Sequence, residues 1–147
     1  MQPKPLDEAE LAALGVATIT GIPDAVVYCD ARGHIRFWNR GAERIFGYSA
    51  AEALGQSLDI IIPERLRKRH WNGYFNMMKT GKSRHDADEM LSVPATTRSG
   101  ATISVQFSVA PLKDENGAIE GIISILRDET ETYNELRRLR KIESQHM

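Results

Sequence analysis

The chain has 147 residues, of which 41% are hydrophobic and 27% are charged, and its formal net charge is -1. These values fit one soluble globular domain. They provide no overall positive charge that would attract nucleic acid or an anionic membrane. The single cysteine, Cys29, excludes a disulfide framework and a cysteine-based zinc site. Because no stretch has the apolar length of a membrane span or the layout of a signal peptide, we expect a cytoplasmic protein without direct membrane or nucleic-acid contacts.

A short helix is expected at the start of the chain. Asp7 is a good N-cap, acidic residues follow it in the first turn, and Leu11 and Leu14 supply apolar positions. These features predict a helix over residues 7–18. Such a short, alanine-rich helix needs a surface to pack against, and either the domain core or a second chain would provide one.

A hairpin and two short helices are expected next. Residues 25–30 and 34–38 are rich in β-forming side chains and flank a glycine turn, which predicts two antiparallel strands. Asn39 is a helix cap and Gly47 a helix stop, so a short helix is expected between them. Ser49, followed three residues later by a glutamate, has the spacing of a capping box and begins another short helix.

The stretch from Pro63 to Gly81 predicts one long helix with a histidine on its apolar side. Proline is favoured in the first turn of a helix and glycine just after its end. An apolar stripe with helical spacing is formed by Leu66, His70, Tyr74 and Met77 or Met78. An imidazole on such a stripe is a neutral structural residue, a hydrogen-bond anchor or a metal ligand.

Beyond this helix the apolar pattern changes to the alternation of strands. Strands are predicted over residues 90–97, 101–112 and 118–127, and Pro94 indicates an edge strand or a bulge in the first of them. A polar helix with a thin apolar stripe follows over residues 130–142. Two strands before and three after a helical middle indicate an α+β fold with one antiparallel sheet, helices on one face, and room for a ligand between them.

Several of these stretches together resemble the PAS sensor-domain family. The matching motifs are Val27 to Asp30 with Gly33-His34-Ile35, Trp38-Asn39-Arg40-Gly41-Ala42-Glu43-Arg44-Ile45-Phe46-Gly47-Tyr48-Ser49, Glu52-Ala53-Leu54-Gly55, Arg98-Ser99-Gly100, Asp114-Glu115-Asn116-Gly117 and Gly121-Ile122 running into Arg127-Asp128-Glu129-Thr130. The resemblance implies a five-stranded antiparallel sheet with short helices on one face and a ligand pocket. It divides the chain into an N-terminal flanking helix (1–21), a PAS domain (22–130) and a C-terminal signalling or coiled-coil helix (131–147).

The resemblance also implies roles for individual residues. The helix around His70 is similar to that of haem-binding PAS oxygen sensors, in which the histidine at this place is the proximal iron ligand. By the same resemblance, Met90 and Arg84 lie near the distal side of a haem, and Tyr74 and Trp71 are candidate cofactor contacts. The acid-x-Thr element that links a PAS core to its output helix is matched by Asp128 and Thr130, which are equally suited to capping that helix.

Other interpretations of these residues stay open. A hydrogen-bonded or half-buried structural histidine at position 70 needs no haem, and acidic Asp86, Asp88 and Glu89 would place negative charge near the distal strand. The basic run from Arg65 to Arg69 would contact haem propionates or simply form a solvated helix face. A flavin photoreceptor is disfavoured because Cys29 lies in a predicted strand, where a small buried hydrophobic role is expected.

The sequence predicts a sensory module rather than an enzyme, since it has no catalytic triad, metalloprotease motif, phosphate-binding loop or paired carboxylates. We expect a homodimer that signals through its C-terminal helix to a kinase, cyclase or transcription-factor output domain, in the same chain or in a partner. The preferred ligand is haem, with gas or redox sensing as the task. The alternative is a cofactor-free PAS domain that serves protein interaction and dimerisation.

Overall fold

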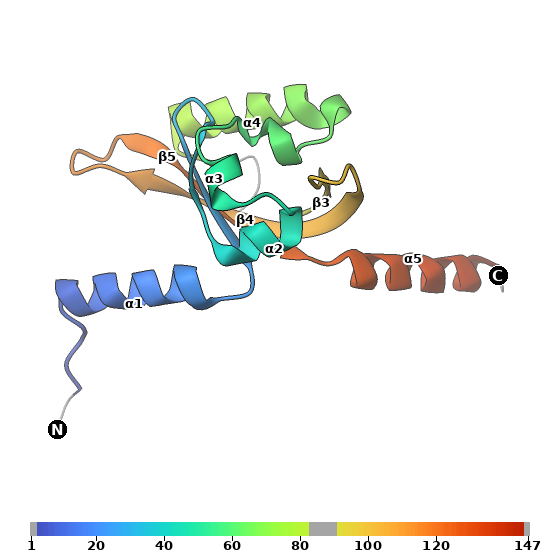
Figure 1. Ribbon diagram of the computed structural model, residues 1–147, viewed down its shortest axis with the longest axis horizontal. Helices are drawn as coiled ribbons and strands as arrows, with labels where there is room; N and C mark the ends of the chain where they lie inside the picture. The colour runs from blue at the N-terminus through green and yellow to red at the C-terminus, as the bar shows by residue number, and fades with distance from the viewer. Residues whose placement is uncertain (1–2, 83–90, 146–147) are drawn as a thin grey trace.

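The computed structural model describes residues 3–82 and 91–145 of the chain. The strands are β1 (Ala25–Asp30), β2 (Ile35–Trp38), β3 (Leu91–Thr96), β4 (Thr102–Lys113) and β5 (Ile119–Asp128). The helices are α1 (Glu8–Gly21), α2 (Arg40–Phe46), α3 (Ala50–Ala53), the 3-10 turns η1 (Leu58–Ile61) and η2 (Glu64–Leu66), α4 (Arg67–Thr80) and α5 (Thr130–Gln145). Figure 1 shows α2, α3 and α4 against the sheet, with α1 and α5 projecting away from it.

The strands form one five-stranded sheet in the order β2-β1-β5-β4-β3, with antiparallel neighbours throughout. The first and last strands of the fold therefore lie side by side in its centre. β3 lies at an edge and contains Pro94, where a residue without an N–H group costs no ladder hydrogen bond. The predicted α+β fold with a single antiparallel sheet is confirmed.

The predicted helix caps are also confirmed. Asp7 and Glu10 form a capping box at the start of α1, and Ser49 forms another at the start of α3. Asn39 accepts a hydrogen bond at the start of α2, which ends at Gly47 with a φ of 84°. These boundaries follow from contacts within a few residues of the chain, so a local sequence pattern is enough to locate them.

The expectation of one helix from Pro63 onward is wrong in its first turn. The residues after Pro63 form the separate 3-10 turn η2, closed by a 2.8 Å bond from the Leu66 amide to the Pro63 carbonyl. Leu66 has φ -104° and ψ -5° and supplies no side-chain cap, so regular α-helical geometry begins at Arg67. The predicted end is confirmed, because Gly81 takes the left-handed conformation with φ 74°.

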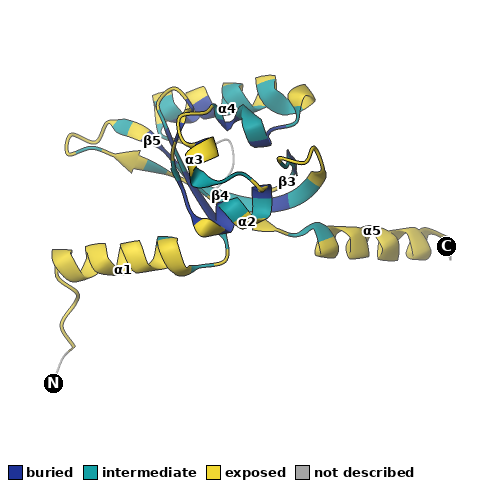
Figure 2. Cartoon of the chain, viewed as in Figure 1, coloured by how far each residue is buried: buried dark blue, intermediate teal, exposed yellow. Residues whose placement is uncertain are grey.

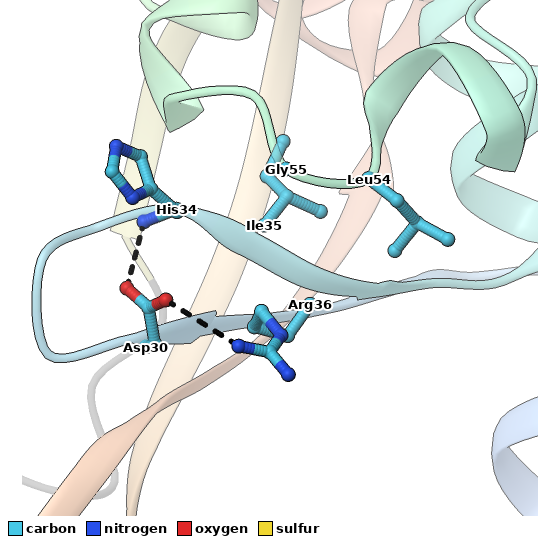
Figure 3. Close-up of a pocket in the computed structure, with 6 residues that line it drawn as sticks. All are labelled: Asp30, His34, Ile35, Arg36, Leu54 and Gly55. Carbon is cyan, nitrogen blue, oxygen red and sulfur yellow. Dashed lines mark hydrogen bonds and ion pairs between the residues drawn. The ribbon is translucent and has the colours of Figure 1, made fainter.

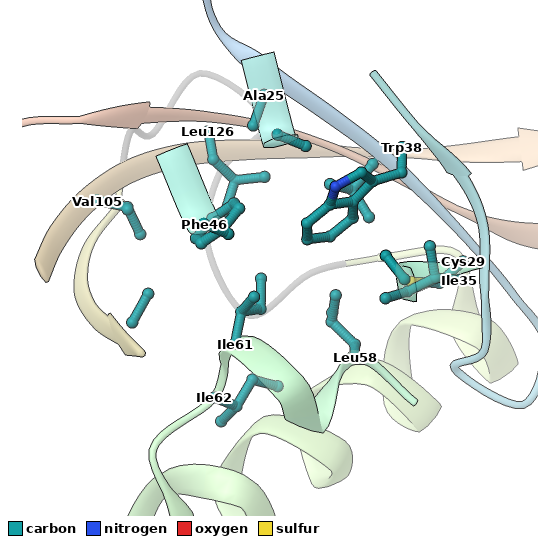
Figure 4. Close-up of a cluster of buried hydrophobic side chains, with 14 of the residues drawn as sticks. Ala25, Cys29, Ile35, Trp38, Phe46, Leu58, Ile61, Ile62, Val105 and Leu126 are labelled. Carbon is teal, nitrogen blue, oxygen red and sulfur yellow. The ribbon is translucent and has the colours of Figure 1, made fainter. Parts of the chain in front are cut away.

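The core lies between the sheet and the helices that cover it. In Figure 4, Cys29 of β1 lies beside Ile35 of β2, and Phe46 of α2 lies near Leu126 of β5, all within one buried cluster. The largest fully buried side chains are Phe46, Ile35, Val27 and Val105. Burying apolar side chains of this size stabilises the fold by about 1.5–3 kcal/mol each, before the entropy of ordering them is subtracted.

The two flanking helices differ from the rest of the fold because their side chains are almost all exposed (Figure 2). The apolar residues of α1 include Leu11 at 58% and Val16 at 60% exposure, and Leu136 and Leu139 of α5 are about half exposed. Both helices extend three residues beyond their predicted ends. Among the described residues, no helix has the length and apolar character to cross a membrane.

Candidate functional site

The predicted histidine stripe lies on the inner side of α4. Tyr74 and Met77 are buried, and His70 and Met78 are partly buried, as the helical spacing of these positions requires. Phe75 and the neighbouring positions on the opposite side are exposed. Helix α4 therefore presents a histidine and an aromatic residue, one turn apart, to the interior of the domain.

His70 lies within a cluster of aromatic rings. Its imidazole is 4.5 Å, between ring centroids, from Trp71 in an edge-to-face arrangement, and 5.9 Å from Tyr74. Trp71 and Tyr74 are themselves 5.1 Å apart. Such tilted pairs hold one another in preferred orientations, so the imidazole has an ordered aromatic surround. The structure thus brings together three of the residues that the sequence singled out.

Contacts from the β1–β2 hairpin and from η1 hold this cluster in place. The indole N–H of Trp71 donates a 2.7 Å hydrogen bond to the Asp59 carboxylate. The Trp71 ring also covers Gly33, whose φ is 84°, so closely that a Cβ at that position would overlap the ring. The Tyr74 hydroxyl donates to the Asp30 carbonyl oxygen. Helix α4 is consequently fixed to the hairpin at two successive turns.

The electrostatic environment of His70 favours the neutral imidazole. Burial lowers the pKa of His70 to about 4, and the negative charge of Asp59 offsets only part of that effect. Its Nδ1 atom is buried and has no hydrogen-bond partner among the described residues. A buried polar atom without a partner is costly, by about 1–3 kcal/mol, and the described residues offer no compensation for this one.

This arrangement fits a haem ligand as far as the described residues extend. Neutral imidazole is the protonation state that coordinates iron, and His70 is in that state with one ring nitrogen unsatisfied. The predicted distal residues Met90 and Arg84 lie outside the described residues. Within the described ranges, no three His, Cys, Asp or Glu side chains converge as a metal site, so a metal here would depend on His70 and the cofactor.

The basic run before His70 divides into two parts. Arg67 turns inward: its guanidinium donates to the carbonyl oxygens of Ile62 (3.1 Å) and Asp59 (3.4 Å). Arg65, Lys68 and Arg69 are exposed. Arg67 thus ties the start of α4 to η1, while the other three form a solvated helix face, one of the two interpretations that the sequence left open.

Cys29 has the buried position that its strand predicted. It is 2% exposed on the inner face of β1, and burial raises the pKa of its thiol to about 12. A thiol that stays protonated at neutral pH is a poor nucleophile. Cys29 is therefore a small apolar core residue, as expected.

Asp128 and Thr130 form a compact junction between β5 and α5. The Asp128 carboxylate accepts from the Thr130 amide at 2.9 Å and from its hydroxyl at 2.6 Å. The Thr130 hydroxyl oxygen in turn accepts from the Ser104 amide at 3.1 Å, and the Glu129 amide donates to the Ser104 carbonyl at 2.9 Å. The start of α5 is thereby bonded to β4. This junction lies apart from the His70 cluster.

A separate surface hollow of about 380 Å³ lies beside the β1–β2 hairpin (Figure 3). Its lining residues are Asp30, His34, Ile35, Arg36, Leu54 and Gly55. The Asp30 carboxylate accepts from the His34 amide at 3.1 Å and lies 4.0 Å from Arg36, so its charge is engaged within the hairpin. The sequence analysis did not predict this hollow or the part played by Asp59, because both arise from contacts between distant segments.

Comparison with known proteins places this geometry in a family. A family model described as PAS fold matches residues 19–134. The chain is 32% identical over 124 residues to sensor protein FixL of Bradyrhizobium diazoefficiens, covering 84% of this chain and 24% of that protein. It is 31% identical over 124 residues to the probable diguanylate cyclase DgcE of Escherichia coli, covering 83% of this chain and 11% of that protein. The chain thus spans a quarter or less of these curated relatives.

A solved structure supports the same assignment at the level of the fold. The crystal structure of the PAS domain of a protein from Colwellia psychrerythraea superposes with a TM-score of 0.72 at 21% identity, covering 82% of this chain and 98% of that one. Together with the family model, these matches give one conclusion. The chain belongs to the PAS family.

Proposed function

We propose that this PAS-family chain is a non-enzymatic sensory module of a signalling protein, which holds a small ligand at the inner side of α4 and passes the signal to α5. The relatives named above include a sensor protein and a probable diguanylate cyclase, which supports a role in signal transduction. The observation that carries the ligand hypothesis is the buried, unpartnered Nδ1 of His70.

Haem is the ligand that these residues favour. His70 would be the iron ligand, with Trp71 and Tyr74 beside it, and Met90 and Arg84 are the candidates for the distal side. A bound haem would supply an iron centre that takes up a diatomic gas or changes oxidation state. Burial by the aromatic cluster keeps the imidazole of His70 unprotonated at neutral pH, so no proton has to leave before it can coordinate.

The cofactor-free interaction domain is the second candidate, and a different observation favours it. Tyr74 and Met77 of α4 belong to the same buried cluster as Cys29 and Ile122 of the sheet, so side chains already occupy part of the space between helix and sheet. In this reading His70 is a structural residue, and the domain acts only through the surfaces it offers to partners.

Both candidates use the flanking helices for association. The narrow apolar stripe of α5, with Tyr133, Leu136, Leu139 and Ile142 between about 38% and 49% exposed, fits a parallel two-helix contact between two copies of the chain. We propose a homodimer with an output domain in the same chain or in a partner. Deletion from Thr130 onward should lower the sedimentation mass from dimer to monomer; an unchanged mass would assign dimerisation to another surface.

Titration with hemin separates the two candidates. The wild-type chain should develop a Soret band, and His70→Ala should bind hemin at least about tenfold more weakly. Removing a residue that only hydrogen-bonds a metal ligand already weakens metal binding by about tenfold or more, and removing the ligand itself should weaken it further. His34→Ala is the matched control, since the His34 side chain is exposed and lines the separate hollow, and it should bind as wild type does. Equally weak binding by wild type and His70→Ala would reject haem and favour the cofactor-free domain.

A further inference from the structure

The two flanking helices join the domain at neighbouring points, although they lie at opposite ends of the sequence. β1 and β5 are adjacent and antiparallel, and Ala25, the first residue of β1, pairs with Leu126 near the end of β5. Helix α1 therefore enters the sheet beside the place where α5 leaves it. Figure 1 shows the two helices leaving the same side of the domain and extending in opposite directions.

An arginine–carboxylate pair connects these two points. Nε and Nη2 of Arg127 donate to the two carboxylate oxygens of Asp24, at 3.1 and 3.0 Å. Asp24 is the last residue before β1, and Arg127 directly precedes the Asp128 junction. Two parallel bonds fix the relative orientation of the two groups as well as their distance. We call this pair the Asp24–Arg127 bridge.

The α1 side of the bridge is held firmly to the core. The buried side-chain amide of Asn39 donates to the carbonyl of Ile19, in the last turn of α1, at 2.8 Å and to that of Asp24 at 3.0 Å. Gly41 contacts the Asp24 carbonyl so closely that a Cβ there would overlap it. The carbonyl of Pro23 accepts from Arg44. The end of α1 and the segment leading to the bridge are therefore parts of one packed unit.

The α5 side is equally continuous. Arg127 is followed by Asp128, whose carboxylate binds both the amide and the hydroxyl of Thr130 at the start of α5. A chain of direct contacts thus runs from the last turn of α1 through Asn39, Asp24 and Arg127 to the first residue of α5. Such a chain has the contiguity that coupling between two elements requires.

The Asp24–Arg127 bridge adds little to the stability of the fold. The Arg127 side chain is 66% exposed, and an ion pair at such an exposed position contributes little to folding. What the pair does supply is a fixed geometry between two segments that are 103 residues apart in sequence. Because both helices project freely from the domain, a small rotation at this point displaces their far ends by a large distance.

We propose that the Asp24–Arg127 bridge couples the direction of α1 to that of α5, so that the domain relays a movement of one flanking helix to the other without any ligand. This goes beyond the proposed ligand-sensing function, with which it shares only the use of α5 as an output. A displacement of the last turn of α1 reaches α5 through Asp24 and Arg127.

The test measures the distance between spin labels on the two helices in ligand-free protein. Labels are placed at Ala9 and Arg140, both exposed, in a Cys29→Ala background, and labelled chains are diluted with excess unlabelled protein so that distances within one chain dominate. In wild type the distance distribution should be narrow. Arg127→Gln should widen it about twofold, because a single hydrogen bond at most replaces the paired geometry.

Two further variants make the result specific. Arg98→Gln removes another surface pair, with Glu52 at 2.9 Å and 61% exposure of the arginine, that lies away from both helix junctions, and it should leave the distribution unchanged. The swap Asp24→Arg with Arg127→Asp should restore the wild-type width. All variants should keep the wild-type urea midpoint of unfolding, which shows that the fold itself is unchanged. The proposal would be overturned by an unchanged width of the distance distribution in Arg127→Gln, by equal widening in Arg98→Gln, or by a swap variant whose distribution stays wide. Because no hemin is present, none of these results bears on haem binding.

Discussion

Two polar side chains, Asn39 and His70, lie inside the domain under conditions that differ sharply. The carboxamide oxygen of Asn39 accepts from the amides of Val26 and Ala42, and its NH₂ group donates to two carbonyl oxygens. All four hydrogen-bonding positions of the side chain are thus used. The Nδ1 atom of His70 is also buried but has no partner among the described residues.

The difference is between a buried polar side chain that is fully hydrogen-bonded and one with an unsatisfied nitrogen. A fully bonded asparagine fixes one arrangement of α1, β1 and α2, and the fold gains from it. A histidine with a buried, unsatisfied nitrogen lowers stability, and a bound ligand is the compensation that we propose for His70. We expect substitutions on the Asn39 side to damage the fold more than substitutions on the His70 side.

The largest effect should follow Asn39→Ala. It leaves two amides and two carbonyl groups without their partner, and we expect the free energy of unfolding to fall by about 2–4 kcal/mol. Asn72→Ala is the control, because Asn72 is exposed on α4, and it should change stability by less than about 0.5 kcal/mol. Urea denaturation followed by circular dichroism measures both, and similar small losses in the two variants would contradict the structural role of Asn39.

The second prediction concerns the pH dependence of folding at His70. The folded pKa is about 4 against an ordinary value of 6.5, so the unfolded chain binds more protons between these pH values. Stability is fully present above pH 6.5 and is lost as the pH falls towards 4, by up to about 3 kcal/mol from this residue. His70→Asn should remove that part of the acid sensitivity and His34→Asn should keep it. Parallel pH profiles in wild type and His70→Asn would reject the buried neutral imidazole.

Glycine-to-alanine substitutions should have opposite signs on the two sides of the molecule. At Gly41 a Cβ would overlap the Asp24 carbonyl oxygen, so Gly41→Ala should cost about 1–3 kcal/mol. At Gly73 of α4 a Cβ would meet nothing within 4 Å, so Gly73→Ala should gain about 0.5–1 kcal/mol from helix propensity alone. Thermal melts show whether each substitution raises or lowers the melting temperature. A lower melting temperature for Gly73→Ala would mean that the packing around α4 differs from that described.

The smallest effect should come from the anchor beneath the His70 cluster. Trp71→Phe keeps an aromatic ring but removes part of the indole and its hydrogen bond to Asp59, and the loss of that bond should cost about 1 kcal/mol. A double-mutant cycle with Asp59→Ala isolates that bond, and a coupling energy of about 1 kcal/mol is expected. Additive losses in the double variant would show that the two side chains act independently.

The sequence predicted the local parts of this fold well. Asp7, Asn39 and Ser49 cap their helices by contacts within three residues, and the alternation of apolar residues is enough to predict the strands. The irregular first turn at Leu66 was missed, because a proline before a basic run satisfies the helix pattern without a capping side chain. Local pattern is therefore informative wherever the stabilising partner is near in sequence.

The features that distinguish the site depend on distant partners. That His70 is on the inner side of α4 was predictable from helical spacing, but its aromatic surround depends on Asp59 and the Gly33 turn, which no periodicity connects to it. The same holds for the bond from Asn39 to Ile19 and for the Asp24–Arg127 bridge. The haem ligand, the relay role of Asp128 and Thr130, and the division of the chain at residues 21 and 130 stay predictions.

The most direct test of this account is an NMR titration of the imidazole ring nitrogens of His70 in ligand-free protein. We predict a neutral ring down to about pH 4, with an Nδ1 chemical shift that shows no hydrogen bond. A His70 pKa at or above 6.5, or an Nδ1 shift of a hydrogen-bonded nitrogen, would contradict the claim that this residue is held ready for a ligand.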